Sequence, residues 1–433
     1  MLTVRRDPEA IAVRTVELSE PLHPLSDVTA YNAVRVFVLR DGCPIGSVDI
    51  PNHYQPVSLA RLRDTIVDRL AFMLVRPLVA RELGGTEERP SAPSLRADVS
   101  ASVVVATYDR PDDLRKCLRY LSAQESPRPV EIVVVDNHPA SGLTPAVVAE
   151  FPGVVLVDEP RQGLAYARNA GFVAATGDIL IATDDDVTIP AGWLEKIVAP
   201  FADPEVMAVT GNVLPLELET RAQVLFESYG GLGRGFYGWV ADRDWFTRCA
   251  RAVPTWKIGA TANAAFRASI FAHPKVGLMH EPLGPGMPSG VGEDAYLFYK
   301  ILEAGYKIAY DPAAYVWHRH RRDMKALRRQ LYAYSKGHVA YQLTTLFRDR
   351  DRRALVRLGY ELPRGYLWYL KRRLFNGSHY PLAMVGLEVL GHLNGPWALW
   401  RSHRRVRREG RSGPYVAVAE RPATAASRRT AVG

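Results

Sequence analysis

The stretch Asp178-Ile-Leu-Ile-Ala-Thr-Asp-Asp-Asp186 joins a short apolar run to three consecutive carboxylates. The run has the length and composition of a buried strand, and the carboxylates come where that strand would leave its sheet. Carboxylates at such a place can bind a hard divalent cation, and the cation can bind a diphosphate. A solvated acidic turn before the helix that follows Pro190 is the alternative. The neighbouring sequence favours the first interpretation.

Apolar runs of strand length alternate with helical segments on both sides of this stretch. The runs cover residues 102–106, 130–135, 154–157 and 179–182, and helices are expected to begin at Pro111 and Gly163. Short apolar strands separated by helices predict an α/β fold, with a parallel sheet covered by helices on both faces.

Polar residues follow three of these strands. Thr107 and Asp109 come after the first strand, Asp136 comes after the second, and Asp184 to Asp186 come after the last. A single Asp after a strand is often only a turn former. Because the carboxyl ends of parallel strands meet at one edge of a sheet, three such ends together predict a ligand site there.

Two further positions carry candidate chemistry. Glu293 and Asp294 open a predicted helix directly after the Gly- and Pro-rich segment 284–292, so either is placed to act as a general base beside a flexible loop. Acidic residues are also common in first helical turns for electrostatic reasons alone, and that reading stays open. His318 follows a strand-like run and can complete a metal shell with carboxylates, although a lone His is often structural.

The remaining sequence indicates two accessory parts. Residues 1–96 form a predicted α+β module with a hairpin turn at Asp41-Gly42, a helix over 59–83 and a linker over 84–93. Residues 97–320 form the sheet domain, 321–410 a helical basic extension, and 411–433 a disordered tail.

The positive charge of the chain lies in its C-terminal quarter. Residues 319–433 carry 25 Lys and Arg against 7 Asp and Glu, a net +18, so residues 1–318 carry −9 of the total of +9. The apolar stretch 381–400 contains Glu388, His392 and Pro396, which predicts an interfacial or packed helix pair instead of a spanning helix. An anionic membrane surface suits this tail, with a solvated helical surface as the alternative and nucleic acid as a less favoured partner.

The cysteines and the N-terminus bear on location. Cys43, Cys117 and Cys249 are odd in number and lack disulfide or zinc spacing, which favours a reducing compartment. Residues 1–8 contain no apolar core of a secretory signal. We therefore expect a cytoplasmic protein that is peripheral on the inner face of the cell membrane.

Taken together, six short strings resemble the family-2 glycosyltransferases with the GT-A fold. The strings run in order from about residue 101 to 320 and cover residues 103–111, 132–137, 163–171, 183–186, 292–294 and 316–318. The resemblance implies a Rossmann-like, mostly parallel sheet and an inverting transfer of a sugar from a nucleotide-diphosphate donor, with Mn²⁺ or Mg²⁺ as cofactor. A UDP-sugar donor and a lipid-linked, peptide or cell-envelope glycan acceptor are favoured.

The same resemblance assigns roles to individual residues. It implies that Thr107, Asp109, Asp136, Arg168, Asp184, Asp185 and Asn263 contact the nucleotide sugar, that Asp184, Asp186 and His318 bind the metal in a DXD-type site, and that Asp294, with Glu293 beside it, is the base. Lys300 stands where the family often has Arg, and no signature of the processive members is evident, which favours single additions.

Two other functions remain open. A sugar-nucleotide nucleotidyltransferase also combines such a sheet with metal-bound phosphates, but it usually needs a Gly-rich loop after the first strand. Here residues 107–111 read Thr-Tyr-Asp-Arg-Pro and offer no such loop. A non-catalytic basic scaffold that binds membrane or nucleic acid is the second alternative.

Overall fold

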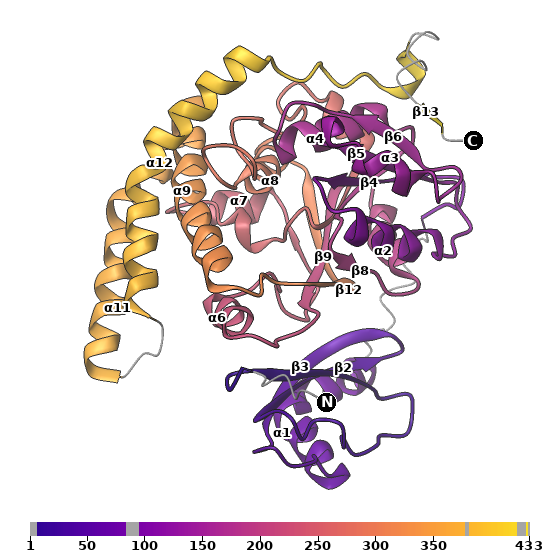
Figure 1. Cartoon of the computed structure of the whole chain (residues 1–433), viewed down its shortest axis with the longest axis vertical. Coiled ribbons are helices and arrows are strands. Elements are labelled where there is room, and N and C mark those ends of the chain that lie inside the picture. The colour runs from indigo at the N-terminus through magenta and orange to yellow at the C-terminus, as the bar shows by residue number, and fades with distance from the viewer. Residues whose placement is uncertain (1–6, 84–94, 377–380, 422–429, 432–433) are drawn as a thin grey trace.

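The computed structural model describes residues 7–83, 95–376, 381–421 and 430–431, which form three parts (Figure 1). A small N-terminal module lies at one end of a central sheet domain, and long C-terminal helices lie along one side of that domain. The predicted linker 84–93 falls outside the described residues.

The central sheet is mixed and mostly parallel around the site, which confirms the predicted fold class. Its strand order is β10-β12-β9-β11-β7-β4-β5-β6-β13, and β8 pairs with β12. β4, β5, β6 and β7 are mutually parallel, β12 is parallel to β9, and β11 runs antiparallel between β7 and β9. The bounds are β4 (Ala101–Thr107), β5 (Val130–Asp136), β6 (Val155–Asp158), β7 (Ile179–Asp184), β8 (Val187–Thr188), β9 (Val206–Pro215), β10 (Trp239–Ala241), β11 (Asn263–Arg267), β12 (Lys307–His318) and β13 (Thr430–Ala431).

Helices cover both faces of this sheet because alternate residues of each strand point to opposite sides. Val103 and Val105 of β4 pack in one buried cluster with Leu114 and Leu118, whereas Val104 packs in another with Phe172. The helices of the domain are α2 (Pro111–Ser122), α3 (Leu143–Val148), α4 (Leu164–Ala174), α5 (Trp193–Val198), α6 (Arg221–Tyr229), α7 (Arg243–Arg248) and α8 (Glu293–Glu303).

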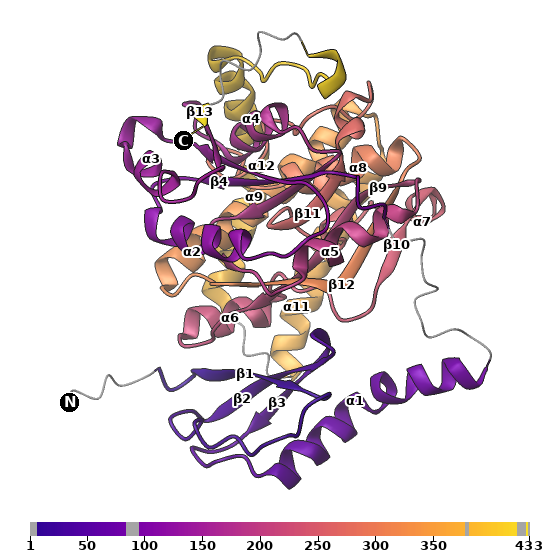
Figure 2. The same ribbon diagram turned by 90° about the vertical axis from the view of Figure 1, so that its right-hand side faces the viewer.

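The N-terminal module consists of β1 (Ile11–Glu17), β2 (Ala33–Arg40), β3 (Cys43–Pro51) and α1 (Leu59–Glu82) (Figure 2). β2 and β3 form the predicted hairpin, and both turn residues, Asp41 and Gly42, have positive φ as a two-residue turn of this kind requires. β1 was not expected from the sequence; it pairs in parallel with β2.

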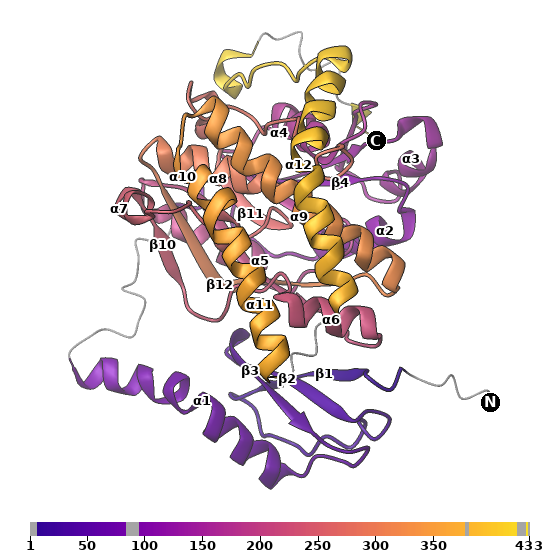
Figure 3. The same cartoon turned by 90° about the vertical axis from the view of Figure 1, so that its left-hand side faces the viewer.

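The C-terminal helices are α9 (Met324–Arg348), α10 (Arg353–Val356), α11 (Leu362–Asn376) and α12 (Leu382–Glu409), with a π-helical turn over 357–361 (Figure 3). The expectation of a helix pair over 381–400 is wrong, because α12 continues through Pro396 as one helix. Close packing supports it: a Cβ on Gly395 would lie 2.5 Å from Val339 Cβ on α9. Among the helices described, none has both the length and the apolarity needed to cross a membrane.

Residues 411–421, for which the sequence predicts disorder, follow an ordered path. The Ser412 amide donates to Glu281 Oε1 at 2.9 Å, and the buried Tyr415 ring lies 5.9 Å from that of Phe271. The rest of the predicted tail is described only at 430–431. These contacts attach the segment after α12 to the sheet domain.

Candidate active site

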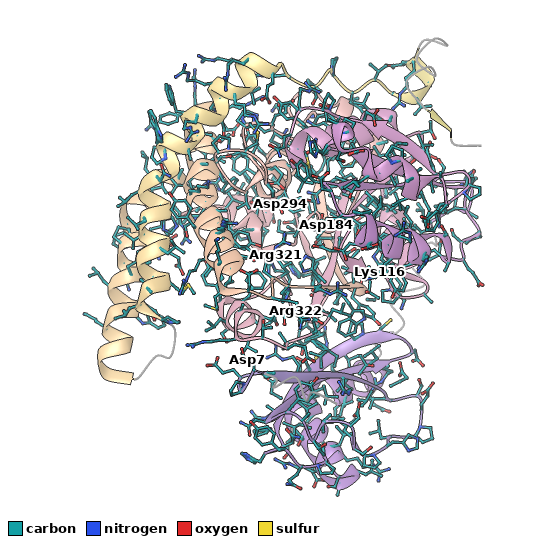
Figure 4. All side chains as sticks on the ribbon, in the orientation of Figure 1. Asp7, Lys116, Asp184, Asp294, Arg321 and Arg322 are labelled. Carbon is teal, nitrogen blue, oxygen red and sulfur yellow. The ribbon has the colours of Figure 1, made fainter. Side chains whose placement is uncertain are left out.

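A cleft of about 1840 Å³ opens at the carboxyl edge of β4 and β7. Thr107, the Asp184 to Asp186 triplet and the start of α8 line its inner part, and residues of α9, α11 and α12 line its outer part. Figure 4 shows Asp184 and Asp294 in the interior, between the sheet and α9. The cleft therefore joins the predicted ligand edge of the sheet to the C-terminal helices.

Asp184, Asp186 and His318 form a candidate metal cluster. One ligand atom from each lies within 4.8 Å of the other two. Asp184 ends β7, His318 ends β12, and the short strand β8 pairs Val187 with His318, which brings the triplet beside the imidazole. The proximity expected for these three residues is thus present.

The donor atoms of this cluster fit a divalent cation. Asp186 Oδ1 is buried without a hydrogen bond and lies 3.3 Å from His318 Nε2. Burial raises the pKa of Asp186, but His318 and Arg110 outweigh burial and hold that pKa below its usual value. Two carboxylates and an imidazole are a donor set that suits Mn²⁺ or Mg²⁺ with nucleotide phosphates as further ligands.

Arg110 neutralises part of the triplet, a role that sequence reasoning missed. Its Nη1 lies 2.8 Å from Asp186 Oδ2 and 3.1 Å from Asp185 Oδ1. Thr107 Oγ1 donates to Asp185 Oδ2 at 2.8 Å. Burial raises the pKa of Asp185 to about 7, and Arg110 opposes this effect. The position of Arg110, three residues after the end of β4, was the signal that could have identified it.

Arg168 connects the metal cluster to the start of α8. From buried α4 its Nη2 lies 2.7 Å from Asp184 Oδ1, and its Nη1 lies 3.6 Å from Glu293 Oε1. It also donates to the hydroxyl and the carbonyl of Thr261, a residue given no role from the sequence. One guanidinium therefore fixes the relative position of the cation ligands and the candidate base.

The two carboxylates at the start of α8 differ in exposure. Glu293 is 3% exposed and accepts from the Gly292 amide, whereas Asp294 is half-buried on the cleft wall. Burial, followed by the charge of Asp294, raises the pKa of Glu293 to about 8. Burial also raises the pKa of Asp294, against the effect of its hydrogen bond from the Ala295 amide.

Three predicted contact residues lie away from the cleft wall. Asn263 is fully buried, with Oδ1 accepting from Trp193 Nε1 and Nδ2 donating to the carbonyls of Asn212 and Ala314. All its polar side-chain atoms are engaged within the protein, and it does not line the cleft. Asp109 accepts from His138 Nδ1 at 2.8 Å and does not line the cleft.

Asp136 is also buried behind the cleft wall. Its Oδ1 accepts from the His138 amide at 2.9 Å, while Oδ2 makes no hydrogen bond among the described residues. Its neighbour Asn137 lines the cleft, as does Tyr108, whose ring stacks on His138 at 5.1 Å. This side of the cleft therefore presents Tyr108 and Asn137, with Asp136 behind them.

A further cation of the cleft, the half-buried Arg234, was not indicated by the sequence. It lies after α6, donates to the Gly233 carbonyl at 2.8 Å, and has its pKa lowered by burial, opposed by Tyr334 and Asp294. No motif marks it, because it reaches the site only through the packing of the segment between α6 and β10.

The segment 284–292 is packed, in contrast to the flexible loop expected beside Asp294. Two hydrogen bonds join the segment to α12. The Ser289 amide donates to Ser402 Oγ at 2.9 Å, and Arg405 Nη1 donates to the Gly286 carbonyl at 2.8 Å. The C-terminal helix thus holds the segment that leads into the candidate base.

Residues 102–272 match the family model described as Glycosyl transferase family 2. This domain belongs to that family. The chain is 28% identical over 270 residues to a "Pre-mycofactocin glycosyltransferase" of Mycobacterium tuberculosis, a match that covers 61% of this chain and 50% of that protein. It is 27% identical over 228 residues to "Succinoglycan biosynthesis protein ExoM" of Rhizobium meliloti, covering 49% of this chain and 64% of that one.

The chain thus spans about half the length of the first of these curated relatives. Among solved structures, the mannosyltransferase PcManGT from Pyrobaculum calidifontis in complex with GDP-Man and Mn²⁺ is similar at 21% identity and a TM-score of 0.42, covering 80% of this chain and 85% of that one.

Proposed function

We propose that this family-2 protein is a metal-dependent glycosyltransferase that transfers a sugar from a nucleotide diphosphate to an acceptor hydroxyl with inversion. The observation that carries the proposal is that Asp184, Asp186 and His318 share one cleft with Asp294. Arg168 joins Asp184 to Glu293, the residue before Asp294. The residues after β4 run directly into α2 without a Gly-rich phosphate loop, which disfavours a nucleotidyltransferase.

The proposed reaction is a single in-line displacement. The acceptor oxygen attacks the anomeric carbon, the bond from that carbon to the phosphate oxygen breaks, and its electron pair leaves with the nucleoside diphosphate. Asp294 takes the proton of the acceptor hydroxyl, a role that its raised pKa favours. A bound cation would supply charge stabilisation to the departing diphosphate. Glu293 acts by holding Arg168.

The donor is proposed to be a UDP-sugar. An Asp carboxylate can accept from the N–H of a uracil ring, and Asp136 Oδ2 makes no hydrogen bond within the described protein. Because Asp136 is fully buried and does not line the cleft, this contact requires the side chains in front of it, Tyr108 and Asn137, to move when the base binds. The exposed Tyr108 ring on the cleft wall offers a stacking surface for the same base.

Calorimetric titration with UDP, GDP and dTDP, each with Mn²⁺ or Mg²⁺ and again with EDTA, tests the proposal. We expect one nucleotide to bind tightly and only with metal. Asp186→Ala should abolish both this binding and turnover, while Asp112→Ala, which removes an exposed carboxylate on α2, should change neither. Activity that survives Asp186→Ala would contradict the metal role, and binding of no nucleotide would favour a non-catalytic scaffold.

The acceptor is proposed to be lipid-linked and reached from an anionic membrane surface. Leu390, Leu393, Trp397 and Trp400 recur every three or four residues along α12 and are all exposed, Leu393 by 74%. Arg404 stacks over Trp400 at 4.8 Å, which places a cation at the end of this apolar stripe. Apolar and cationic side chains together on a helix face suit an anionic bilayer.

The cleft gives such an acceptor a route to the catalytic residues. Trp368 of α11 is 58% exposed and also lines the outer cleft, as do Tyr366 and His392. An acceptor held at the surface of the C-terminal helices would therefore extend inward along aromatic side chains toward Asp294.

Co-sedimentation with vesicles rich in phosphatidylglycerol tests the membrane proposal. The double variant Leu393→Glu, Trp397→Glu should release the protein, because each carboxylate would have to enter the lipid interface. Val67→Glu, at an exposed apolar position of α1, is the matched control and should stay bound. Retention of the double variant would point to another surface.

A further inference from the structure

The N-terminal module rests on the catalytic domain at the start of α6. Ile11 N donates to the Leu218 carbonyl at 2.8 Å, and Arg221 N donates to Asp7 Oδ2 at 2.8 Å. Both contacts involve the segment that begins α6, the helix that carries Glu227 two residues before its end. The module is therefore positioned to act on Glu227.

Arg35 of β2 reaches Glu227 directly. Its Nη1 lies 2.9 Å from Glu227 Oε2, and the side chain is only 21% exposed. Asp49 on β3 holds the same guanidinium through two hydrogen bonds, of 2.7 and 2.9 Å. This three-residue arrangement fixes the carboxylate of the catalytic domain from within the module.

Two imidazoles continue from Glu227 to the metal cluster. Glu227 Oε1 lies 2.9 Å from Nε2 of His320, a side chain that is 1% exposed. His320 Nδ1 lies 3.1 Å from His318 Nδ1, and His318 Nε2 lies 3.3 Å from Asp186 Oδ1. A chain of close polar contacts thus runs from Arg35 to a candidate metal ligand.

Metal binding would fix the proton positions in this chain. If His318 binds a cation through Nε2, its Nδ1 must carry the hydrogen and donate to His320 Nδ1. His320 then carries its hydrogen on Nε2 and donates to Glu227, whose other oxygen accepts from Arg35. His320 therefore accepts at Nδ1 and donates at Nε2, Glu227 accepts from both His320 and Arg35, and the chain has a single consistent orientation.

We propose that the N-terminal module is part of the metal centre, with Arg35, Glu227 and His320 acting as positioning residues that set the ring orientation and tautomer of His318. A second contact has the same effect: the Phe37 ring of the module packs edge-on against Trp317, the residue before His318, at 5.1 Å between centroids. This inference rests on the metal site of the proposed function and gives residues 7–83 a role in it.

Titration of the full-length protein with Mn²⁺ alone, followed by the electron paramagnetic resonance signal of the free ion, measures the effect without turnover. Arg35→Ala and Glu227→Gln should each weaken Mn²⁺ binding by about 10-fold or more, the usual effect of removing a group that orients a metal ligand. Arg35→Lys should restore part of the affinity, because it keeps one donor for Glu227.

Controls separate this role from general stability. Arg14→Ala removes a comparable ion pair of the same module, with Asp27 as its partner, and should leave Mn²⁺ affinity unchanged. Glu227→Gln changes no residue of the N-terminal module. It therefore tests the contact between Arg35 and Glu227 even if Arg35→Ala destabilises the module. The double variant should bind no more weakly than either single variant, since both act through one chain.

The outcomes distinguish this inference from the proposed function. Loss of binding in Asp186→Ala together with unchanged affinity in Arg35→Ala and Glu227→Gln would overturn the inference alone, as would additive effects in the double variant. Absence of Mn²⁺ binding by the wild-type protein would overturn the metal site and the inference together.

Discussion

Glu293 and Asp294 are adjacent carboxylates with different surroundings. Glu293 faces Arg168 inside the protein, and the less buried Asp294 lines the same cleft as the candidate cation ligands. The difference arises because successive residues at the start of a helix point about 100° apart. We therefore expect Asp294 to act as the general base and Glu293 to position Arg168.

Asp294→Asn should separate chemistry from binding. The amide cannot accept the acceptor's proton, so single-turnover transfer should slow by about 100-fold or more while nucleotide affinity stays nearly intact. Asp244→Asn is the matched control, because Asp244 is an exposed acidic residue in the first turn of α7. An equal loss of nucleotide affinity in Asp294→Asn would indicate a structural role.

Glu293 should make the stability of the protein fall as pH rises. Its folded-state pKa of about 8 lies above the ordinary value of 4.5, so between these values the folded protein holds a proton that the unfolded chain releases. The free energy of unfolding should drop across this window by up to about 1.4 kcal/mol per pH unit. Urea unfolding at several pH values should show a shallower decline in Glu293→Gln, whereas the exposed Glu125→Gln should match the wild type.

At the scale of elements, the sequence predicted the residues that lie at the carboxyl ends of the strands. Thr107 and the Asp triplet lie at one edge because β4 and β7 are adjacent and parallel. The alternation of apolar strands with helices indicates the parallel sheet, whereas the adjacency of β4 and β7 is known only from the structure. Asn263 could not be placed, because β11 runs antiparallel between β7 and β9 and directs it into the interior. The parallel pairing of β1 depends on long-range contacts that a local pattern does not contain.

The position of α4 depends on a residue with no side chain. A Cβ on Gly171 would lie 2.3 Å from Val104 Cγ1 and 2.9 Å from Val135 Cγ2, so α4, which carries Arg168, lies directly on β4 and β5. Gly171→Ala should destabilise the protein by about 1–3 kcal/mol. Gly386→Ala on α12, where nothing lies within 4 Å, should be neutral or stabilising by up to about 1 kcal/mol. Urea midpoints measure both, and equal midpoints would mean that α4 can shift freely.

At the scale of the whole molecule, an aromatic contact joins the N-terminal module to the catalytic domain. Phe37 is 3% exposed and packs with Leu214, Tyr315 and Trp317 of the catalytic sheet. Phe37→Ala should cost about 3–5 kcal/mol and lower the calorimetric melting temperature. Phe72→Ala, at a 69% exposed position of α1, should change it little. A melting temperature unaffected by Phe37→Ala would show that the two parts unfold independently.

The contacts between α12 and the segment 284–292 limit which C-terminal truncations leave the catalytic site intact. Ser402 and Arg405 of α12 form hydrogen bonds with that segment. The Gly410 carbonyl, directly after α12, accepts a hydrogen bond from the Tyr166 hydroxyl. Deletion of the C-terminal helices, made to remove lipid binding, would also remove the contacts that fix the segment 284–292, which leads into Asp294. Loss of activity in such a truncated protein would therefore reflect a disordered catalytic site. Substitutions of surface residues are needed to separate membrane attachment from catalysis.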